Sequence, residues 1–181
     1  AKEMIDQRCP IEVIDSHLIT IGLGMICTAA AKMAQAGESL PSVVTKVKQM
    51  ISSTRLLGLF DTLKYLALGG RIGKAKALLG SVLNVKPLIT LKDGEVVPAG
   101  QVRSRAKGIE RLCSFVESAS NIEDLAVAYN TTPDEAQALA ERLSSLFTKE
   151  PIKVVRLGTT LGVHMGPRAL AVGFQEKTSA Q

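Results

Sequence analysis

Apolar residues recur along the chain with two different spacings, and the spacing separates expected strands from expected helices. Short apolar runs at 55–60 and 169–174 predict buried strands. Residues 39–51 instead repeat apolar positions every three or four residues, which predicts an amphipathic helix. The other expected elements are, in chain order, a strand at 11–15, helices at 16–37 and 62–68, a hairpin at 85–102, a helix at 104–118, a strand at 124–130 and a helix at 131–147. Because strands and helices alternate, the pattern predicts an α/β fold with one antiparallel hairpin.

Glycines and short polar residues mark where these elements should begin and end. Gly37 is expected to end the first helix, and the Asp-Gly pair at 93–94 favours a tight turn within the hairpin. Asp61 is expected to cap the short helix that follows it. Thr132 and Glu135 have the spacing of a capping box, which predicts a sharp start for the last long helix.

The composition limits the class of protein. Of the 181 residues, 46% are hydrophobic but only 3% are aromatic, so the core must be largely aliphatic. The opening residues lack the basic-then-apolar order of a secretory signal, and no apolar run reaches the ~20 residues of a membrane span. The three cysteines, at 9, 27 and 113, do not have metal-binding spacing. We therefore expect a cytoplasmic protein that holds no metal.

Positive charge is concentrated in the middle of the chain. Nine basic and three acidic side chains lie between Arg71 and Arg111, an excess larger than the whole chain's net charge of +5. Such a basic face suits an anionic ligand, an acidic protein partner or nucleic acid, unless it is only a solvated surface. Nucleic acid is the least favoured partner, because no aromatic side chains interleave with the charges to stack on bases. We expect no nucleic-acid partner.

Two glycine-containing stretches imitate nucleotide-binding motifs but lack essential residues. Residues 21–27 place Cys27 where a dinucleotide fingerprint needs its third glycine. The Gly-Lys pair at 73–74 imitates a P-loop, yet Leu68 and Ala75 stand where that motif needs a glycine and a hydroxyl residue. The sequence therefore argues against a nucleotide, and we expect no cofactor.

Two side chains are candidates for binding an anion. Arg71 follows the paired glycines of "GGRIGK", a turn that can present its guanidinium to a ligand. His164 lies in the glycine- and proline-rich stretch "GVHMGP", which predicts a turn with a fixed backbone and a ring that can face a cavity. Asp15, Ser16 and His17 are too close in sequence to form a hydrolase triad. The residues alone indicate an α/β protein with a basic face and an anion site, and they do not name its function.

Three stretches, taken together, resemble one protein family. Residues 12–37 look like the strand, Asp-Ser and Gly-x-Gly helix of the DegV family of bacterial fatty-acid-binding proteins, and residues 162–174 look like its closing His-x-Gly-Pro strand. Residues 61–112, which begin "DTLKYLALGGRIGK", are similar to the family's most specific segment. The resemblance implies a DegV-like α/β fold, a mixed sheet flanked by helices, with most of the amino-terminal domain missing. It implies that residues 1–60 are a remnant of that domain and that residues 61–181 form the carboxy-terminal α/β domain.

The resemblance also implies a function and a set of site residues. Members of the family bind one long-chain fatty acid with its carboxylate hydrogen-bonded and its tail buried, and some present it to a separate fatty acid kinase for phospholipid synthesis. His164 and Arg71 are then the expected ligands of the carboxylate. Lys74, Arg103 and Arg105 are the expected basic face toward the kinase or, transiently, a membrane surface. No catalytic residue is expected, so the protein should be a carrier and not an enzyme.

Two points stay open at the level of sequence. The family usually has a glycine after the His-x-Gly-Pro motif, and this chain has Arg168 there, a charge that either alters ligand preference or faces solvent. The carrier also has two rivals. One is an enzyme that acts on a phosphorylated metabolite through Arg71 and the lysines, and the other is a regulatory interaction module that uses the basic face.

Overall fold

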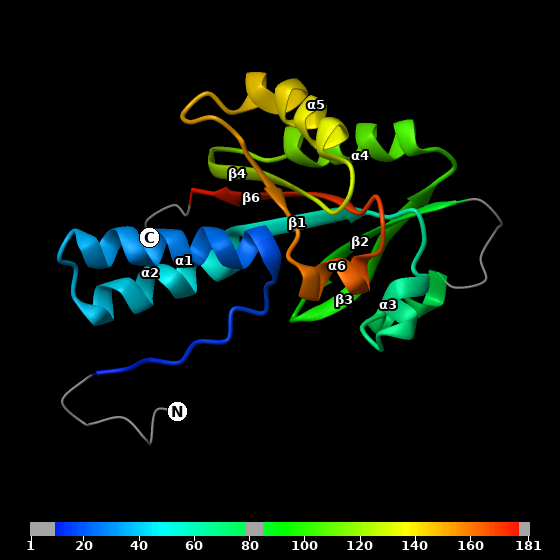
Figure 1. Cartoon of the computed structure of the whole chain (residues 1–181). Helices are drawn as coiled ribbons and strands as arrows, with labels where there is room; N and C mark the ends of the chain where they lie inside the picture. The colour runs from blue at the N-terminus through cyan, green and yellow to red at the C-terminus, as the bar shows by residue number, and fades with distance from the viewer. Residues whose placement is uncertain (1–9, 79–84, 178–181) are drawn as a thin grey trace.

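Six strands of the described chain form one mixed sheet (Figure 1). The computed structural model describes residues 10–78 and 85–177. Across the sheet the strands follow the order β3-β2-β1-β6-β4-β5. Their bounds are β1 (Thr54–Leu59), β2 (Lys86–Lys92), β3 (Glu95–Val102), β4 (Ile122–Tyr129), β5 (Lys153–Arg156) and β6 (Leu170–Glu176). Neighbouring strands are antiparallel except β4 and β5, which run parallel, so the predicted mixed sheet is confirmed.

Helices cover both faces of this sheet. They are α1 (Thr20–Gln35), α2 (Leu40–Ser53), α3 (Lys64–Leu68), α4 (Arg105–Glu117), α5 (Pro133–Leu143) and α6 (Thr159–Met165), with short 3₁₀ turns at η2 (Gly73–Leu78) and η3 (Ser144–Leu146). Helices α4 and α5 cover one face, and α1, α3 and α6 lie on the other, where α2 packs on α1 (Figure 1). We call these the α4/α5 face and the α1/α6 face. None of the helices within the described ranges is long and apolar enough to cross a bilayer.

Large and small side chains alternate along the strands, and this makes the two faces of the sheet different. Successive residues of a strand point to opposite faces. The α4/α5 face receives the large side chains Leu57, Leu59, Leu125, Val127, Leu170, Val172 and Phe174. The α1/α6 face receives Gly58, Ala126, Ala128, Ala171 and Gly173 at alternating positions. The larger side chains Leu56, Phe60 and Ile89 lie on this face too. Those of Phe60 and Leu56 pack directly over Gly58 and Gly173, respectively.

Several predicted ends of elements are confirmed. Helix α1 ends at Gln35, two residues before Gly37, whose φ of +83° lies in the left-handed region that favours glycine. Asp93 and Gly94 join β2 to β3 with φ values of 52° and 78°. Two successive positive φ values are what a tight type I′ hairpin turn requires, so the Asp-Gly signal indicated the correct turn.

The predicted strand at 11–15 is wrong. These residues run outside the sheet, and the side chain of Val13 is 77% exposed. Ile14 instead packs against the cluster that joins α1 to α2, which contains Ile26 and Met50. Apolar residues of this segment therefore cover the pair of helices. A short apolar run of this kind looks the same in the sequence as a strand, so the pattern alone cannot separate the two.

Two predicted cap hydrogen bonds do not form, although α5 does begin at Pro133 with Thr132 as its N-cap residue. Asp61 does not cap α3, because the hydroxyl of Thr62 accepts the hydrogen bond from the backbone N–H of Lys64 at 3.1 Å. Thr132 makes no side-chain cap bond to the backbone of α5. Its hydroxyl lies 3.3 Å from a carboxylate oxygen of Glu135, which in turn binds an arginine of α4. The carboxylates of Asp61 and Glu135 instead pair with cationic side chains. Interactions with a charged partner are stronger than a hydrogen bond to a neutral backbone N–H.

The predicted boundary at residue 60 stays a prediction. Strand β1 belongs to the first predicted range and lies between β2 and β6, which belong to the second. Its Leu59 is fully buried beneath α4, where a Cβ on Gly108 would lie 2.5 Å from the Leu59 side chain.

Candidate functional site

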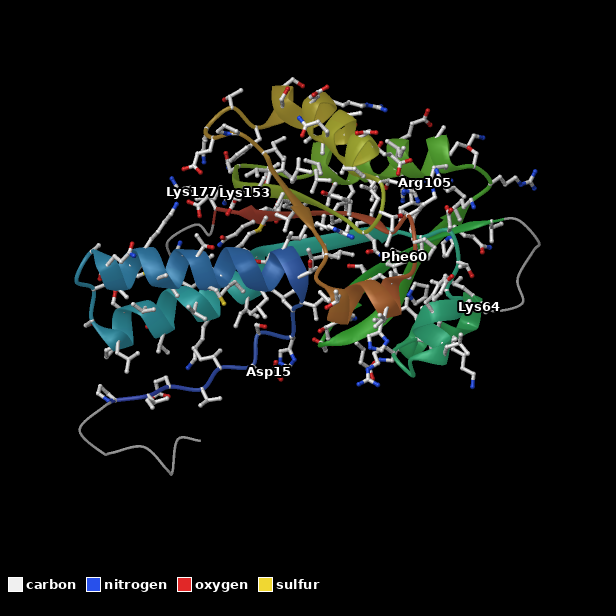
Figure 2. The ribbon with its side chains drawn as sticks, viewed as in Figure 1. Asp15, Phe60, Lys64, Arg105, Lys153 and Lys177 are labelled. Carbon is white, nitrogen blue, oxygen red and sulfur yellow. The ribbon has the colours of Figure 1, made fainter. Side chains whose placement is uncertain are left out.

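An apolar cavity lies on the α1/α6 face of the sheet. It has a volume of about 510 Å³, including space open to solvent, and lies between the sheet, the start of α1 and α6. Its walls include Leu56, Gly58, Phe60, Ile89, Met165 and Ala171. Figure 1 shows the start of α1 beside α6, and Figure 2 shows Phe60 at the end of β1, above α6. The lining is apolar apart from Thr20 and Thr90, and the Thr90 hydroxyl donates to the Leu56 carbonyl at 2.6 Å. The cavity therefore suits an uncharged hydrocarbon.

Small residues of the sheet create this cavity. Gly58, Ala169 and Ala171 contribute no side chain larger than a methyl group to its wall. The missing side chain of Gly58 is replaced by the ring of Phe60, because a Cβ on Gly58 would lie 2.7 Å from Cε2 of that ring. The sequence did contain a signal, since "LAVAY" and "ALAVGF" alternate large with small residues. Sequence reasoning read those runs as strands and missed what the small positions do.

His164 lies in the last turn of α6, so the prediction that a turn holds it is wrong. The turn begins two residues later, at Gly166, whose φ is +74°. The imidazole is half-buried against the backbone at the end of α3, because a Cβ on Gly69 would lie 2.1 Å from its Nδ1. The next residue, Met165, lines the cavity. His164 is thus held at the border between α3, α6 and the apolar space.

Arg71 also contacts Gly69. Its Nη1 donates to the carbonyl oxygen of Gly69 at 2.9 Å, and the side chain is exposed. Gly70, with a φ of +68°, lets the chain reverse after α3 and bring Arg71 back toward it. The structure therefore brings the two predicted carboxylate ligands, His164 and Arg71, into contact with the same residue, Gly69.

Asn130 and Tyr65 fix the end of α6 in place. The side-chain amide of Asn130 donates to the carbonyl oxygens of Gly162 and Gly166, at 3.2 and 2.7 Å. A Cβ on Gly166 would lie 2.2 Å from Cδ2 of Tyr65, so the tyrosine ring packs directly on that glycine. These contacts explain how a short helix can hold His164 in one position.

Five charged side chains form a cluster at the ends of β1, α4 and α5, which we call the Asp61 cluster. Lys86 and Arg105 lie 3.2 and 3.6 Å from Oδ1 of Asp61. Arg105 also grips Glu135 with two hydrogen bonds, the one from Nε at 3.0 Å. The hydrogen bond from Arg105 holds the pKa of Glu135 below its usual range, so the carboxylate stays ionised near neutral pH. Arg168, the fifth member, lies 3.7 Å from each carboxylate.

The residues predicted to form the basic face are in three different environments. Arg103 is exposed and has no ion-pair partner within the ranges that the structure describes. Lys74 is also exposed, but it pairs with Glu95 at 2.7 Å, and their hydrogen bond raises the pKa of Lys74. Arg105 has a side chain only 13% exposed and is enclosed in the Asp61 cluster on the α4 side of the sheet (Figure 2). It is therefore a buried structural charge, unlike Arg103.

Two further exposed cations of the basic stretch lie on α4, and sequence reasoning counted them without assigning them to the basic face. Lys107 and Arg111 are four residues apart on α4, a spacing that places side chains on one side of a helix, and Arg103 precedes the helix by two residues. Neither has an ion pair among the described residues. The interval of four was visible in the sequence and could have identified them.

The thiols and acidic groups form no further site in the part of the chain that the structure describes. Cys27 is exposed, and Cys113 is buried, where desolvation raises its pKa. Cys9 lies outside the described residues. Across 10–78 and 85–177, no three His, Cys, Asp or Glu side chains come together as metal ligands would.

The fold and its cavity define an α/β protein with an apolar cavity on one face of a mixed sheet. The family described as "Uncharacterised protein, DegV family" matches residues 1–177, and the chain belongs to the DegV family. A DegV domain-containing protein of Streptomyces coelicolor is 38% identical over 166 residues, which cover 90% of this chain and 59% of that protein.

Solved structures of the family have the same fold. A fatty acid binding DegV family protein from Thermus thermophilus matches with 29% identity and a TM-score of 0.80, over 92% of this chain and 61% of that one. A stearic-acid-binding protein from Eubacterium ventriosum matches with 26% identity and a TM-score of 0.79, over 91% of this chain and 58% of that one. The chain therefore spans about three fifths of the length of the proteins that it matches.

Proposed function

We propose that this protein binds a long-chain fatty acid, with the tail in the apolar cavity and the carboxylate at the turn where His164 and Arg71 meet Gly69. The observation that carries the proposal is that both donors contact Gly69, while Met165, the residue after His164, lines a cavity with uncharged walls. The neighbouring structures from Thermus thermophilus and Eubacterium ventriosum, described as fatty-acid-binding, support it. In this role the protein performs no chemistry of its own.

The energetics are consistent with such a ligand. Burying about 14 methylene groups at roughly 0.8 kcal/mol each gives a gross gain of about 11 kcal/mol. Part of this gain is offset by the loss of freedom on association. A carboxylate moved out of water needs hydrogen-bond donors, because an unpaired buried charge is expensive. Arg71 donates one N–H group to the Gly69 carbonyl oxygen, and its other N–H groups can donate to a ligand.

Native mass spectrometry of the purified protein tests this proposal. We expect a one-to-one adduct whose mass matches a C14–C18 acid, confirmed in the organic extract of the same sample. The variant Ala171→Leu fills the cavity wall and should shift the adduct toward shorter acids or remove it. Ala31→Leu makes the same change at an exposed position of α1 and should leave the adduct unchanged. If palmitate added in excess forms no adduct with the unmodified protein, the proposal is wrong for this chain.

We also propose that the protein works in the cytoplasm and presents the bound carboxylate to a separate fatty acid kinase. The exposed cations Arg103, just before α4, and Lys107 and Arg111, on α4, support this, because they offer an acidic partner a surface that internal ion pairs do not neutralise. Lys74 and Arg105 are already paired with carboxylates of this chain, so Arg103 becomes the principal candidate of the predicted set.

Charge reversal on α4 tests the docking. The double change Arg103→Glu and Lys107→Glu should raise the KM of a bacterial fatty acid kinase for the palmitate-loaded protein several-fold, and added salt should narrow the difference. Palmitate affinity should not change. Lys48→Glu, an exposed reversal on α2, is the control. An unchanged KM in the double variant would place the partner elsewhere, and loss of binding to anionic vesicles alone would favour a membrane surface over a kinase.

A further inference from the structure

Arg168 adopts a backbone conformation that costs energy for any residue with a side chain. Its φ is +57°, in the left-handed region, where contact between Cβ and the backbone costs roughly 1–2 kcal/mol. Its backbone N–H donates to the hydroxyl of Thr131 at 3.0 Å, which helps to hold this conformation. A strained residue persists where surrounding contacts determine its position, so the contacts of the side chain are informative.

The guanidinium of Arg168 connects two carboxylates that belong to different segments. Nη1 lies 3.7 Å from Oδ2 of Asp61, and Nη2 lies 3.7 Å from Oε1 of Glu135. Asp61 and Glu135 are only 23% and 20% exposed, whereas Arg168 is 49% exposed and closes the cluster from outside. The planar guanidinium has two terminal nitrogens and can face both carboxylates at once, whereas the ammonium of a lysine is a single point charge.

These ion pairs link the two chain segments that flank His164, the end of α6 and the start of α3. Arg168 follows α6, and Asp61 leads from β1 into α3. The two helices also touch directly, through the ring of His164 against Gly69 and the ring of Tyr65 against Gly166. The ion pairs therefore tie together, from outside, the same two helices whose inner contact determines where the imidazole lies.

We propose that Arg168 is a positioning residue: by binding Asp61 and Glu135 it holds α6 against α3 and thereby sets the orientation of the His164 ring. Its effect on lipid affinity rests on the function proposed above, whereas its effect on the ring does not. Arg168 makes no contact with the cavity and acts only through His164. The left-handed backbone conformation of Arg168 is the energetic cost of having a guanidinium at this position in place of a glycine.

The variant Arg168→Gly separates positioning from stability. It removes the guanidinium and at the same time relieves the left-handed strain, because glycine adopts this φ freely. The protein contains only two histidines, so a spectrum of the histidine-labelled protein resolves His164 with His17 as an internal reference. We expect the ring signals of His164 to shift and broaden, those of His17 to stay, and palmitate affinity to fall about fivefold, the scale of a favourable ion pair.

Two further variants complete the test. Arg168→Lys keeps a charge and should restore part of the His164 signal and part of the affinity. Arg142→Ala removes an exposed arginine from the end of α5 and should alter neither. Unchanged His164 signals in Arg168→Gly overturn the positioning role, whatever the lipid result. A shifted His164 signal with unchanged palmitate affinity supports positioning and instead removes His164 from the proposed carboxylate site.

Discussion

Replacing His164 by alanine should weaken the binding of palmitate by roughly 5- to 150-fold, or about 1–3 kcal/mol. The ring lies between α3 and α6 and precedes Met165, which lines the cavity, so its loss leaves a carboxylate at the cavity's end one donor short. A buried acceptor that loses its partner costs its full desolvation energy. Titration calorimetry with palmitate measures the change, and unfolding by heat shows whether the variant is as stable as the parent.

Gly69→Ala should displace the His164 ring without changing His164 itself. The new Cβ would lie 2.1 Å from Nδ1 and 2.6 Å from Cε1 of His164, so the ring must move. The φ of Gly69 is −81°, which alanine adopts without strain, and the ring is the movable end of a side chain. We therefore expect a loss of affinity like that of His164→Ala with little loss of stability.

Gly24→Ala is the matched control for this change. A Cβ at Gly24 meets no atom within 4 Å, so the same methyl group is added in α1 without contact. It should leave affinity unchanged and raise stability by about 0.5–1 kcal/mol, because alanine favours a helix over glycine. Wild-type affinity in both His164→Ala and Gly69→Ala would show that His164 is not a ligand of the carboxylate.

The elements that the sequence predicted correctly are those that local chemistry decides. The hairpin turn at 93–94 follows from the backbone freedom of an Asp-Gly pair, and the start of α2 follows from the side chain of Ser39, which accepts from the N–H of Ser42. Both signals act between residues that are close neighbours in the chain. Strand β1 was equally visible, because an unbroken apolar run is typical of a strand buried on both faces.

The errors come from partners that lie far away in the sequence. Asp61 has the right chemistry for a helix cap, but Lys86, Arg105 and Arg168 reach it from three other elements. No local pattern contains that information. Glu135 does not complete the predicted capping box for the same reason. Its carboxylate binds the guanidinium of Arg105 and not a backbone N–H at the start of the helix.

The candidate site shows the same division between local and distant chemistry. Arg71 and His164 could be selected as anion ligands from their glycine-rich surroundings, but their meeting at Gly69 depends on how α3 packs against α6. The cavity depends on which face of the sheet receives the small residues. That choice becomes visible only when β1, β4 and β6 are placed side by side.

Gly166→Ala should lower the free energy of unfolding by about 2–4 kcal/mol, because it adds a Cβ at a positive φ and against the Tyr65 ring. The φ of +74° disfavours any Cβ, at a cost of roughly 1–2 kcal/mol. The added atom would also lie 2.2 Å from Cδ2 and 2.9 Å from Cγ of Tyr65, and overpacking costs typically 1–3 kcal/mol. Because Cγ is among the close atoms, rotation of the ring cannot relieve the contact. The midpoint of thermal unfolding should fall by roughly 5–15 °C for a chain of this size.

Gly37→Ala separates the two parts of that cost. Gly37 has a φ of +83°, similar to that of Gly166, but a Cβ there meets no atom within 4 Å. It should therefore lose only the backbone part, about 1–2 kcal/mol. If both variants lose the same stability, Tyr65 does not pack on Gly166 as described. If Gly166→Ala loses more, the difference combines the contact with Tyr65 and the ψ of 174° at Gly166, which with a positive φ is a backbone region adopted essentially only by glycine.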